Sequence, residues 1–229
     1  MEIQTIKVQR LYLQVAQQLQ GLIESGAIEV GARLPSERDL ASQFGVSRPT
    51  VREAMIALEI AGLVEVRSGS GVYVLARPDH PGRVAQMQGP GPFEILEARR
   101  LIEGETCALA AQRIDAQQLA RLQELVDEMA EENRREVVTE QADEAFHCLV
   151  AEAAGNSALA ATVTWLWRLR NESEISTHFH RRVRAEGNRP IVADHQAILD
   201  ALRAGDPQAA RQAMSGHLQR VIDQLLEAR

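Results

Sequence analysis

The sequence predicts a mainly α protein with one small β-hairpin in its N-terminal part. Apolar residues make up 45% of the 229 residues and aromatic residues only 3%, a composition that favours helices packed on helices. Apolar residues recur at helical spacing along most of the chain, and two short β-branched runs interrupt that pattern. The length suits two modest domains or one large one.

The first two helices are marked by their periodicity and by their ends. Apolar residues recur at helical spacing over 11–23, and Gly26 follows as a natural stop. Ser36 can cap a second, short helix, with an acidic residue three positions later as in a capping box. We expect that helix to end at Gly45.

A third helix and a hairpin follow. Ser47 is suited to cap the third helix, and Gly62 lies just past its expected end. The runs 63–67 and 72–75 are rich in β-branched residues and flank a Ser-Gly-Ser-Gly turn, which predicts two paired strands. Three helices followed by a hairpin is the order of a winged helix-turn-helix.

The remaining chain divides into a linker and a helical domain. Residues 76–93 contain four prolines and three glycines, a density that disfavours both helix and sheet. We therefore expect a winged helix-turn-helix domain over 1–77, a linker over 78–93 and an all-helical domain over 94–229. About six helices in an antiparallel bundle are expected there. Helical periodicity breaks near Ile114, Arg135, Gly155, Gly187 and Gly205.

A winged helix-turn-helix predicts binding to double-stranded DNA. The second helix of such a motif enters the major groove, where arginine can bond guanine and small hydroxyl side chains can bond phosphate. Two other interpretations stay open: the arginines are ordinary solvated charges, or the motif serves protein contacts. The candidate DNA-binding residues are Arg38, Ser47, Arg48, Thr50 and Arg52, with the wing-tip residues Ser68 and Gly69.

The charge distribution permits that function despite a net charge of -7. Residues 1–78 hold eight basic and eight acidic residues, so the acidic excess belongs to the rest of the chain. Within 33–52 four arginines face two acidic residues, which leaves a local positive excess where DNA would lie.

Other classes of protein are disfavoured by the composition. The two cysteines, Cys107 and Cys148, lie far apart, so neither a disulfide framework nor a thiolate zinc site is supported. No apolar run approaches the roughly 20 residues that a membrane helix needs, and the N-terminus lacks the plan of a signal peptide. We expect a cytoplasmic protein with no membrane partner.

A carboxylate and three imidazoles predict a metal site in the helical domain. Asp143 and His147 lie four residues apart, so both side chains project from one face of a helix. His195 and His217 each adjoin apolar stretches that should face the bundle interior. A shared cation would offset the cost of burying them. One carboxylate with imidazoles suits zinc, which is our first candidate, and also nickel, manganese or iron; the ligands alone do not choose among them. An ordinary salt-bridged helix is the alternative.

Four motifs of the N-terminal part are typical of a known family. They are Leu34-Pro35-Ser36-Glu37-Arg38-Asp39-Leu40-Ala41, Val46-Ser47-Arg48-Pro49-Thr50-Val51-Arg52-Glu53-Ala54, Leu63-Val64 and Gly69-Ser70-Gly71-Val72-Tyr73-Val74. In these motifs the chain resembles the GntR family of bacterial regulators. That resemblance implies a homodimer on a pseudo-palindromic operator, with Arg38, Arg48, Thr50, Arg52, Ser68 and Gly69 where family members touch DNA.

The helical part resembles the FCD-type effector domain of the same family, on the segments 97–103, 143–147, 194–202 and 209–218. The resemblance implies a metal held by Asp143, His147, His195 and His217, and an arginine, Arg99, that grips an acidic effector. A structural pair between Arg99 and Glu103 is the alternative. His178 and His180 have no counterpart in the motif and are expected at the surface or in a cavity. The side chains that could also line that cavity are Trp165, Trp167, Arg168 and Arg170.

Three further stretches, 10–12, 91–99 and 155–161, resemble the hexuronate-operon branch of the family. That branch implies a uronic or aldonic sugar acid as effector and repression that the effector relieves. Responders to lactate, dicarboxylates and amino acids share the fold and remain alternatives. A metal-dependent enzyme that activates water, and a purely structural metal without an effector, are rivals from other classes.

Overall fold

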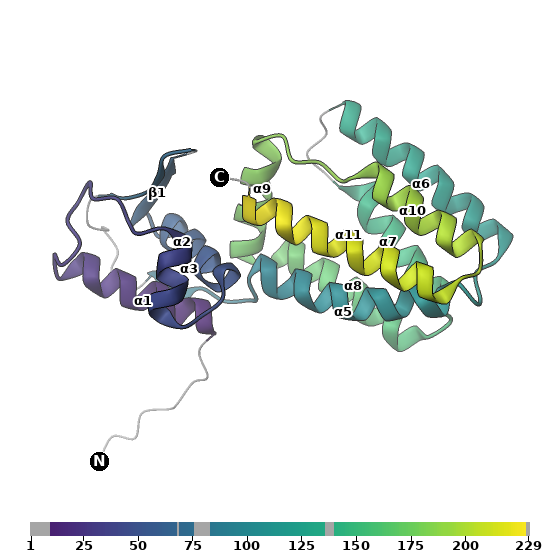
Figure 1. Ribbon diagram of the computed structural model, residues 1–229, viewed down its shortest axis with the longest axis horizontal. Coiled ribbons are helices and arrows are strands. Elements are labelled where there is room, and N and C mark those ends of the chain that lie inside the picture. The colour runs from purple at the N-terminus through teal and green to yellow at the C-terminus, as the bar shows by residue number, and fades with distance from the viewer. Residues whose placement is uncertain (1–9, 68, 76–82, 136–139, 228–229) are drawn as a thin grey trace, which may run out of the picture. The chain divides into compact units, whose positions relative to one another are not determined.

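The computed structural model describes residues 10–67, 69–75, 83–135 and 140–227 (Figure 1). The chain forms two compact units, which we describe separately. The first comprises residues 1–93 with 173–178, and the second comprises 94–172 with 179–228.

Three helices form the core of the first unit: α1 (Leu11–Glu24), α2 (Glu37–Phe44) and α3 (Arg48–Ile60). Both α1 and α2 pack against α3. The predicted start of α2 is confirmed, because the Ser36 hydroxyl accepts a hydrogen bond from the Asp39 amide at 3.2 Å. Its end is confirmed as well, since Gly45 takes the left-handed conformation with φ of 67°.

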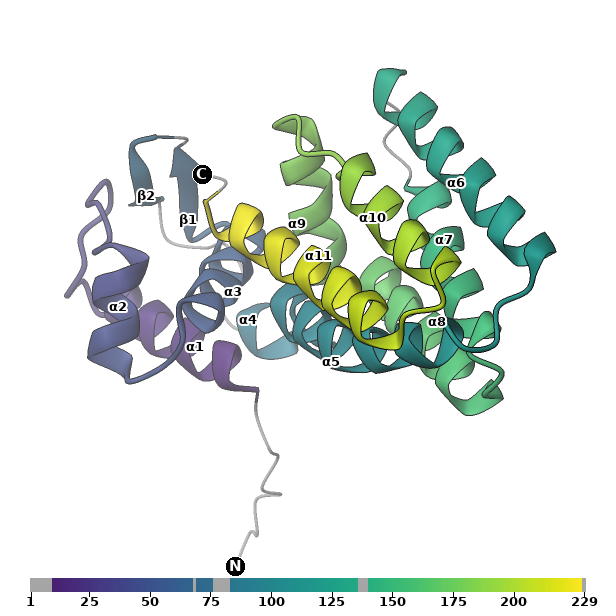
Figure 2. The same ribbon diagram turned by 45° about the vertical axis from the view of Figure 1, so that its right-hand side comes forward.

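The predicted hairpin follows α3 directly. Strands β1 (Val64–Arg67) and β2 (Gly71–Val74) pair antiparallel, with Val64 opposite Val74. The amide of Leu34 donates to the carbonyl of Val72 at 2.9 Å, which ties the segment before α2 to the hairpin. Figure 2 shows these strands beside the three helices. The winged helix-turn-helix architecture is therefore confirmed.

The proline- and glycine-rich stretch contains more helix than its composition predicts. A short helix, α4 (Arg83–Gln86), lies within it, and the next helix begins at Pro92. Proline is compatible with the first turn of a helix, since its missing amide hydrogen has no partner there. Residues 78–82 of the expected linker lie outside the described residues.

The helical domain contains seven helices in its described residues, where about six were expected. The additional break falls at Ser173, in a stretch without glycine or proline, so periodicity continues across it. The seven helices are α5 (Pro92–Ala110), α6 (Ala116–Arg134), α7 (Gln141–Ala153), α8 (Ser157–Glu172), α9 (Glu174–Ala185), α10 (Val192–Arg203) and α11 (Pro207–Glu227).

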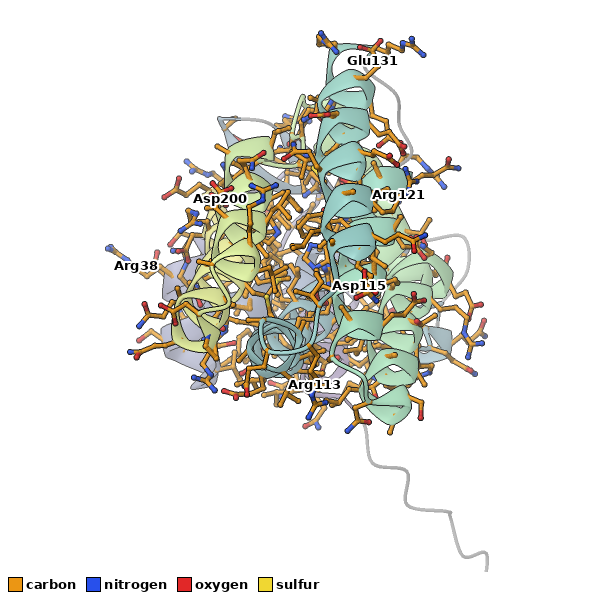
Figure 3. The ribbon with its side chains drawn as sticks, turned by 90° about the vertical axis from the view of Figure 1, so that its right-hand side faces the viewer. Arg38, Arg113, Asp115, Arg121, Glu131 and Asp200 are labelled. Atoms are coloured by element: carbon orange, nitrogen blue, oxygen red, sulfur yellow. The ribbon has the colours of Figure 1, made fainter. Side chains whose placement is uncertain are left out.

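The second unit has a continuous helical core, which confirms the mainly α fold class. Helix α6 packs against α7 and α10, α7 against α8, and α10 against α11. Figure 3 shows α6 along one face of the bundle, from its capping residue Asp115 to Glu131 near its other end. Among the fully buried side chains are Phe146, Trp167 and Ile198. No helix in the described ranges is long and apolar enough to cross a membrane.

Candidate functional site

Four side chains from three helices of the second unit converge on one point. Asp143 and His147 project from successive turns of α7, His195 from α10 and His217 from α11. One ligand-type atom from each residue lies within 4.8 Å of all the others. All four residues are at least nine-tenths buried, and His195 is fully buried. The structure thus brings together the four residues that the sequence predicts as metal ligands.

Each of the three imidazoles is held through its Nδ1 atom by a different acceptor. Nδ1 of His147 contacts Oε2 of Glu103 on α5. Nδ1 of His195 lies 2.9 Å from the backbone carbonyl of Ile191, one turn earlier. Nδ1 of His217 lies 3.2 Å from Oδ2 of Asp194. An Nδ1–H that donates to such an acceptor leaves the Nε2 lone pair for a metal, which is the common arrangement around metal-bound histidine.

The inward-facing atoms of the cluster have no hydrogen-bond partner of their own. Nε2 of His195 lies 2.8 Å from Oδ1 of Asp143, and Nε2 of His147 lies 3.6 Å from the same oxygen. All three atoms are buried and lack acceptable hydrogen-bond geometry. With a hydrogen on each Nδ1 and none on Nε2, the centre of the cluster would hold only acceptors. Acceptors without donors are costly to bury, and a divalent cation removes that cost.

The electrostatics keep the acidic members of the cluster ionised. Burial by itself would raise the pKa of Glu103, but Arg99 and His147 outweigh it and hold that pKa at about 2. Burial would also raise the pKa of Asp143, yet His147 and His195 hold it well below its usual value. Burial lowers the pKa of His217 to about 4 against the opposing effect of Asp194. Burial would lower the pKa of His147 as well, but Glu103 and Asp143 outweigh it and raise that pKa. Because ionised carboxylate and neutral imidazole are the forms that bind a metal, His147 would release its proton when an ion binds.

A cavity adjoins this cluster within the same unit. Asp143 and His217 form part of its wall, so an ion held by the cluster would face the cavity. The empty space that it encloses is about 590 Å³, which includes open solvent at its mouth. Its charged lining is mostly basic: the carboxylates of Glu140 and Asp143 face the guanidinium groups of Arg99, Arg170, Arg184 and Arg189. An anion is therefore the favoured occupant.

Arg99 forms the structural pair that the sequence leaves open and also lines the cavity. Its Nε atom lies 2.6 Å from Oε1 of Glu103, so the structural pair exists. Its guanidinium also lies over the ring of Trp167, 4.0 Å from the ring centroid. The Nη2 atom is buried without a hydrogen-bond partner, and the residue lines the cavity. The pair with Glu103 therefore leaves part of the guanidinium for a ligand.

The other expected cavity residues separate into two groups. Arg170 and His180 line the cavity, and Trp167 lies buried beneath Arg99. Trp165 and Arg168 are exposed on α8 instead and are not among the lining residues.

The sequence does not mark every residue that contacts the cluster or lines the cavity. It predicts Glu103 only as a partner of Arg99, although Glu103 also contacts His147. Asp194 directly precedes His195, but its contact is with His217, a pairing between two helices that spacing along one helix cannot indicate. Glu140, Arg184 and Arg189 also line the cavity without any motif to mark them.

The candidate DNA-binding residues occupy the start of α3 and its surroundings. Arg48 is half-exposed, and its Nη2 atom lies 3.8 Å from Glu37. Arg38 projects from α2 into the open (Figure 3). The Ser47 hydroxyl accepts from the Thr50 amide at 3.2 Å, and the two hydroxyl oxygens lie 2.8 Å apart. Both residues therefore take part in the helix cap.

The wing tip is described only in part. Gly69 is exposed and takes a left-handed conformation with φ of 71°, as the tight turn between the strands requires. Ser68, the other wing residue expected to touch DNA, lies outside the described residues.

Arg52 is not the ordinary solvated charge that one interpretation of its sequence position expects. It is buried rather than solvated, and it faces Glu37 rather than open solvent. Its Nε and Nη2 atoms donate to the two carboxylate oxygens of Glu37 at 2.7 and 2.9 Å. A bidentate pair of this kind is geometrically specific and joins α2 to α3. That Arg52 also touches DNA stays a prediction.

The comparison with known proteins follows the same division of the chain. Residues 11–74 match the family described as bacterial regulatory proteins, gntR family, and residues 94–220 match the FCD domain. The Exu regulon transcriptional regulator of Escherichia coli is 38% identical over 92% of this chain and 82% of its own length. The Uxu operon regulator of Haemophilus influenzae is 35% identical over 96% of this chain and 84% of its own length.

Another relative is named for a different operon. The putative L-lactate dehydrogenase operon regulatory protein of Escherichia coli is 34% identical over 91% of this chain and 84% of its own length.

A winged helix followed by a helical domain with a basic cavity defines a DNA-binding transcription regulator that responds to a small molecule. The chain belongs to the GntR family, in the branch with an FCD effector domain. The family and these relatives are transcription regulators, which decides against the enzyme interpretation of the Asp/His cluster.

Proposed function

We propose that this regulator senses a sugar acid, with a hexuronate as the leading candidate, at a metal-dependent site. One observation carries the proposal: Asp143 and His217 belong to the Asp/His cluster and also line the arginine-rich cavity. A divalent cation held by Asp143, His147, His195 and His217 would supply open coordination positions for a carboxylate or hydroxyl oxygen. Zinc is the first candidate, and nickel, manganese and iron are the others.

The residues of the cavity supply the rest of the binding site. The free Nη2 edge of Arg99 is suited to a ligand carboxylate, because guanidinium bonds such groups strongly and directionally. The names of two relatives, regulators of the Uxu operon and the Exu regulon, support a hexuronate over other acids. The relative named for a lactate dehydrogenase operon keeps lactate as the second candidate.

Operator binding is assigned to the first unit. Residues 1–77 then form the DNA-binding domain, 78–93 the linker and 94–229 the effector-binding domain. Arg48 and Arg38 contact the bases or the backbone of the operator. The phosphates are approached by Ser47, Thr50 and the wing residues Ser68 and Gly69. Arg52 acts by holding α2 on α3. A homodimer on a pseudo-palindromic operator completes the proposal, and the effector favours one arrangement of its two winged helices.

The proposed function is tested by a mobility-shift assay on DNA upstream of the chain's own gene, with zinc-loaded and chelator-treated protein. Galacturonate, glucuronate, fructuronate and mannonate are added in turn, with lactate and a dicarboxylate as comparisons. We expect a hexuronate to change the shift of the zinc-loaded protein only. If only lactate changes the shift, lactate rather than a hexuronate is the effector. If no acid changes the shift, the metal has a purely structural role.

A further inference from the structure

A carboxylate of the protein itself occupies part of the arginine-rich cavity. Glu140, the residue before α7, forms ion pairs with Arg170 and Arg184. Its Oε1 atom lies 3.1 Å from Nε of Arg184, and its Oε2 atom contacts Nη2 of Arg170. The side chains of Glu140 and Arg170 are nearly nine-tenths buried, and that of Arg184 is 5% exposed. All three residues line the cavity.

This arrangement divides three of the four lining arginines into two sets. Arg170 and Arg184 share the Glu140 carboxylate inside the cavity. Arg99 keeps a buried Nη2 atom without a hydrogen-bond partner, and the cluster of Asp143 and His217 lies at the same wall. The fourth arginine, Arg189, donates through Nη1 to the backbone carbonyls of Arg184 and Asn188. An incoming carboxylate therefore competes with Glu140 at Arg170 and Arg184 but not at Arg99 and the cluster.

A second ligand carboxylate would have to compete with Glu140. Two carboxylates on the same pair of arginines repel each other strongly in a site screened from water. Hydroxyl groups face no such repulsion, because a carboxylate accepts hydrogen bonds from them.

We propose that Glu140 is a specificity-determining residue that closes the Arg170–Arg184 anion site, so the cavity accepts a ligand with one carboxylate and rejects one with two. This inference rests on the proposed function for the position of the first carboxylate. It narrows the ligand class to monocarboxylic polyhydroxy acids and excludes dicarboxylic sugar acids.

The first test uses sulfate, which needs no knowledge of the effector. Glu140→Gln keeps the size of the side chain and removes its charge, which opens the arginine pair to an anion. We expect millimolar sulfate to raise the melting temperature of E140Q by several degrees more than that of the wild type, both measured against chloride at equal ionic strength. Glu144→Gln is the matched control, because Glu144 lies on α7 and pairs with Asn171 outside the cavity lining.

E140A removes the carboxylate by truncation and so opens the same site. It allows the same comparison with the wild type if E140Q does not fold. The double variant E140Q/R184Q removes one charge of each sign and should lose the sulfate response. Equal responses to sulfate in wild type, E140Q and E140A would overturn the proposal, whatever the effector proves to be.

The second test compares galacturonate with galactarate, which differ only in the oxidation state of one terminal carbon. By titration calorimetry on zinc-loaded protein, we expect the wild type to bind galacturonate at least about tenfold more tightly than galactarate. E140Q should reduce that preference to near unity or reverse it, while E144Q should keep it. Wild-type protein that binds galactarate as tightly as galacturonate would refute the proposed role of Glu140. Failure to bind either acid, combined with a selective sulfate response in E140Q, would instead refute the hexuronate assignment.

Discussion

The guanidinium of Arg52 and the carboxylate of Glu37 form a two-bond ion pair between the two helices of the helix-turn-helix, at 2.7 and 2.9 Å. Arg52 is buried, whereas Arg48, one turn earlier on the same helix, is half-exposed. Two arginines four residues apart therefore differ in environment: Arg52 joins α2 to α3, whereas half of the Arg48 side chain stays exposed.

Arg52→Ala should destabilise the first unit. It leaves Glu37 partly buried without its partner, and removal of one member of such a pair costs several kcal/mol. Because the Glu37 side chain is 20% exposed, we expect a smaller loss than for a fully buried pair: the free energy of unfolding should fall by about 2–3 kcal/mol. Urea denaturation followed by circular dichroism measures it. A stable R52A protein that fails only in DNA binding would instead assign Arg52 to the operator.

Arg48→Ala should weaken operator binding without a change in stability. Loss of one base or phosphate contact costs about 1–3 kcal/mol, which corresponds to a roughly five- to hundredfold higher Kd. Mobility-shift titrations at fixed salt measure the change. Arg203→Ala is the control, because Arg203 is a half-exposed arginine of α10 with only surface pairs. If R48A and R203A bind the operator equally well, α3 is not the recognition helix.

His195→Ala should abolish stoichiometric metal binding. His195 is fully buried and contributes one of the unpartnered nitrogens at the centre of the cluster. Purified wild type reconstituted with zinc should hold one ion per chain and melt at a higher temperature than chelator-treated protein, because an ion that binds only the folded state stabilises it. H195A should lose both the ion and the temperature difference. H178A is the control, since His178 lies outside the cluster. Equal zinc content in wild type and H195A would argue against the site.

Glu103→Gln should lower metal affinity without removal of a ligand. The glutamine amide cannot supply the negative charge that orients His147 and favours its Nδ1–H tautomer. Loss of such an outer partner typically costs about 10–100-fold in metal affinity. Competition with a chromogenic chelator at pH 7 measures the change. Glu105→Gln, on the same helix but exposed and paired with Arg211, should leave the affinity unchanged. If E103Q binds the metal with wild-type affinity, Glu103 pairs with Arg99 but does not support metal binding by His147.

Local sequence signals were sufficient for most of the fold. Capping serines and following glycines mark both ends of α2 and the start of α3, so these elements follow from neighbouring residues alone. The break at Ser173 could not be predicted, because no residue that disfavours helix accompanies it. The four residues of the cluster were predicted, two from their spacing and two from adjacent apolar stretches. Glu103 and Asp194 could not be assigned to their histidines, since those contacts join different helices.

Glu103 is shared between Arg99, which lines the cavity, and His147, which belongs to the cluster. A ligand that draws the guanidinium of Arg99 toward itself therefore alters the partner of a cluster imidazole. By thermodynamic linkage the two equilibria must be reciprocal: if the ion strengthens acid binding by some factor, the acid strengthens retention of the ion by the same factor. The regulator would then report on both solutes together, with its occupancy in the cell set by the product of two concentrations.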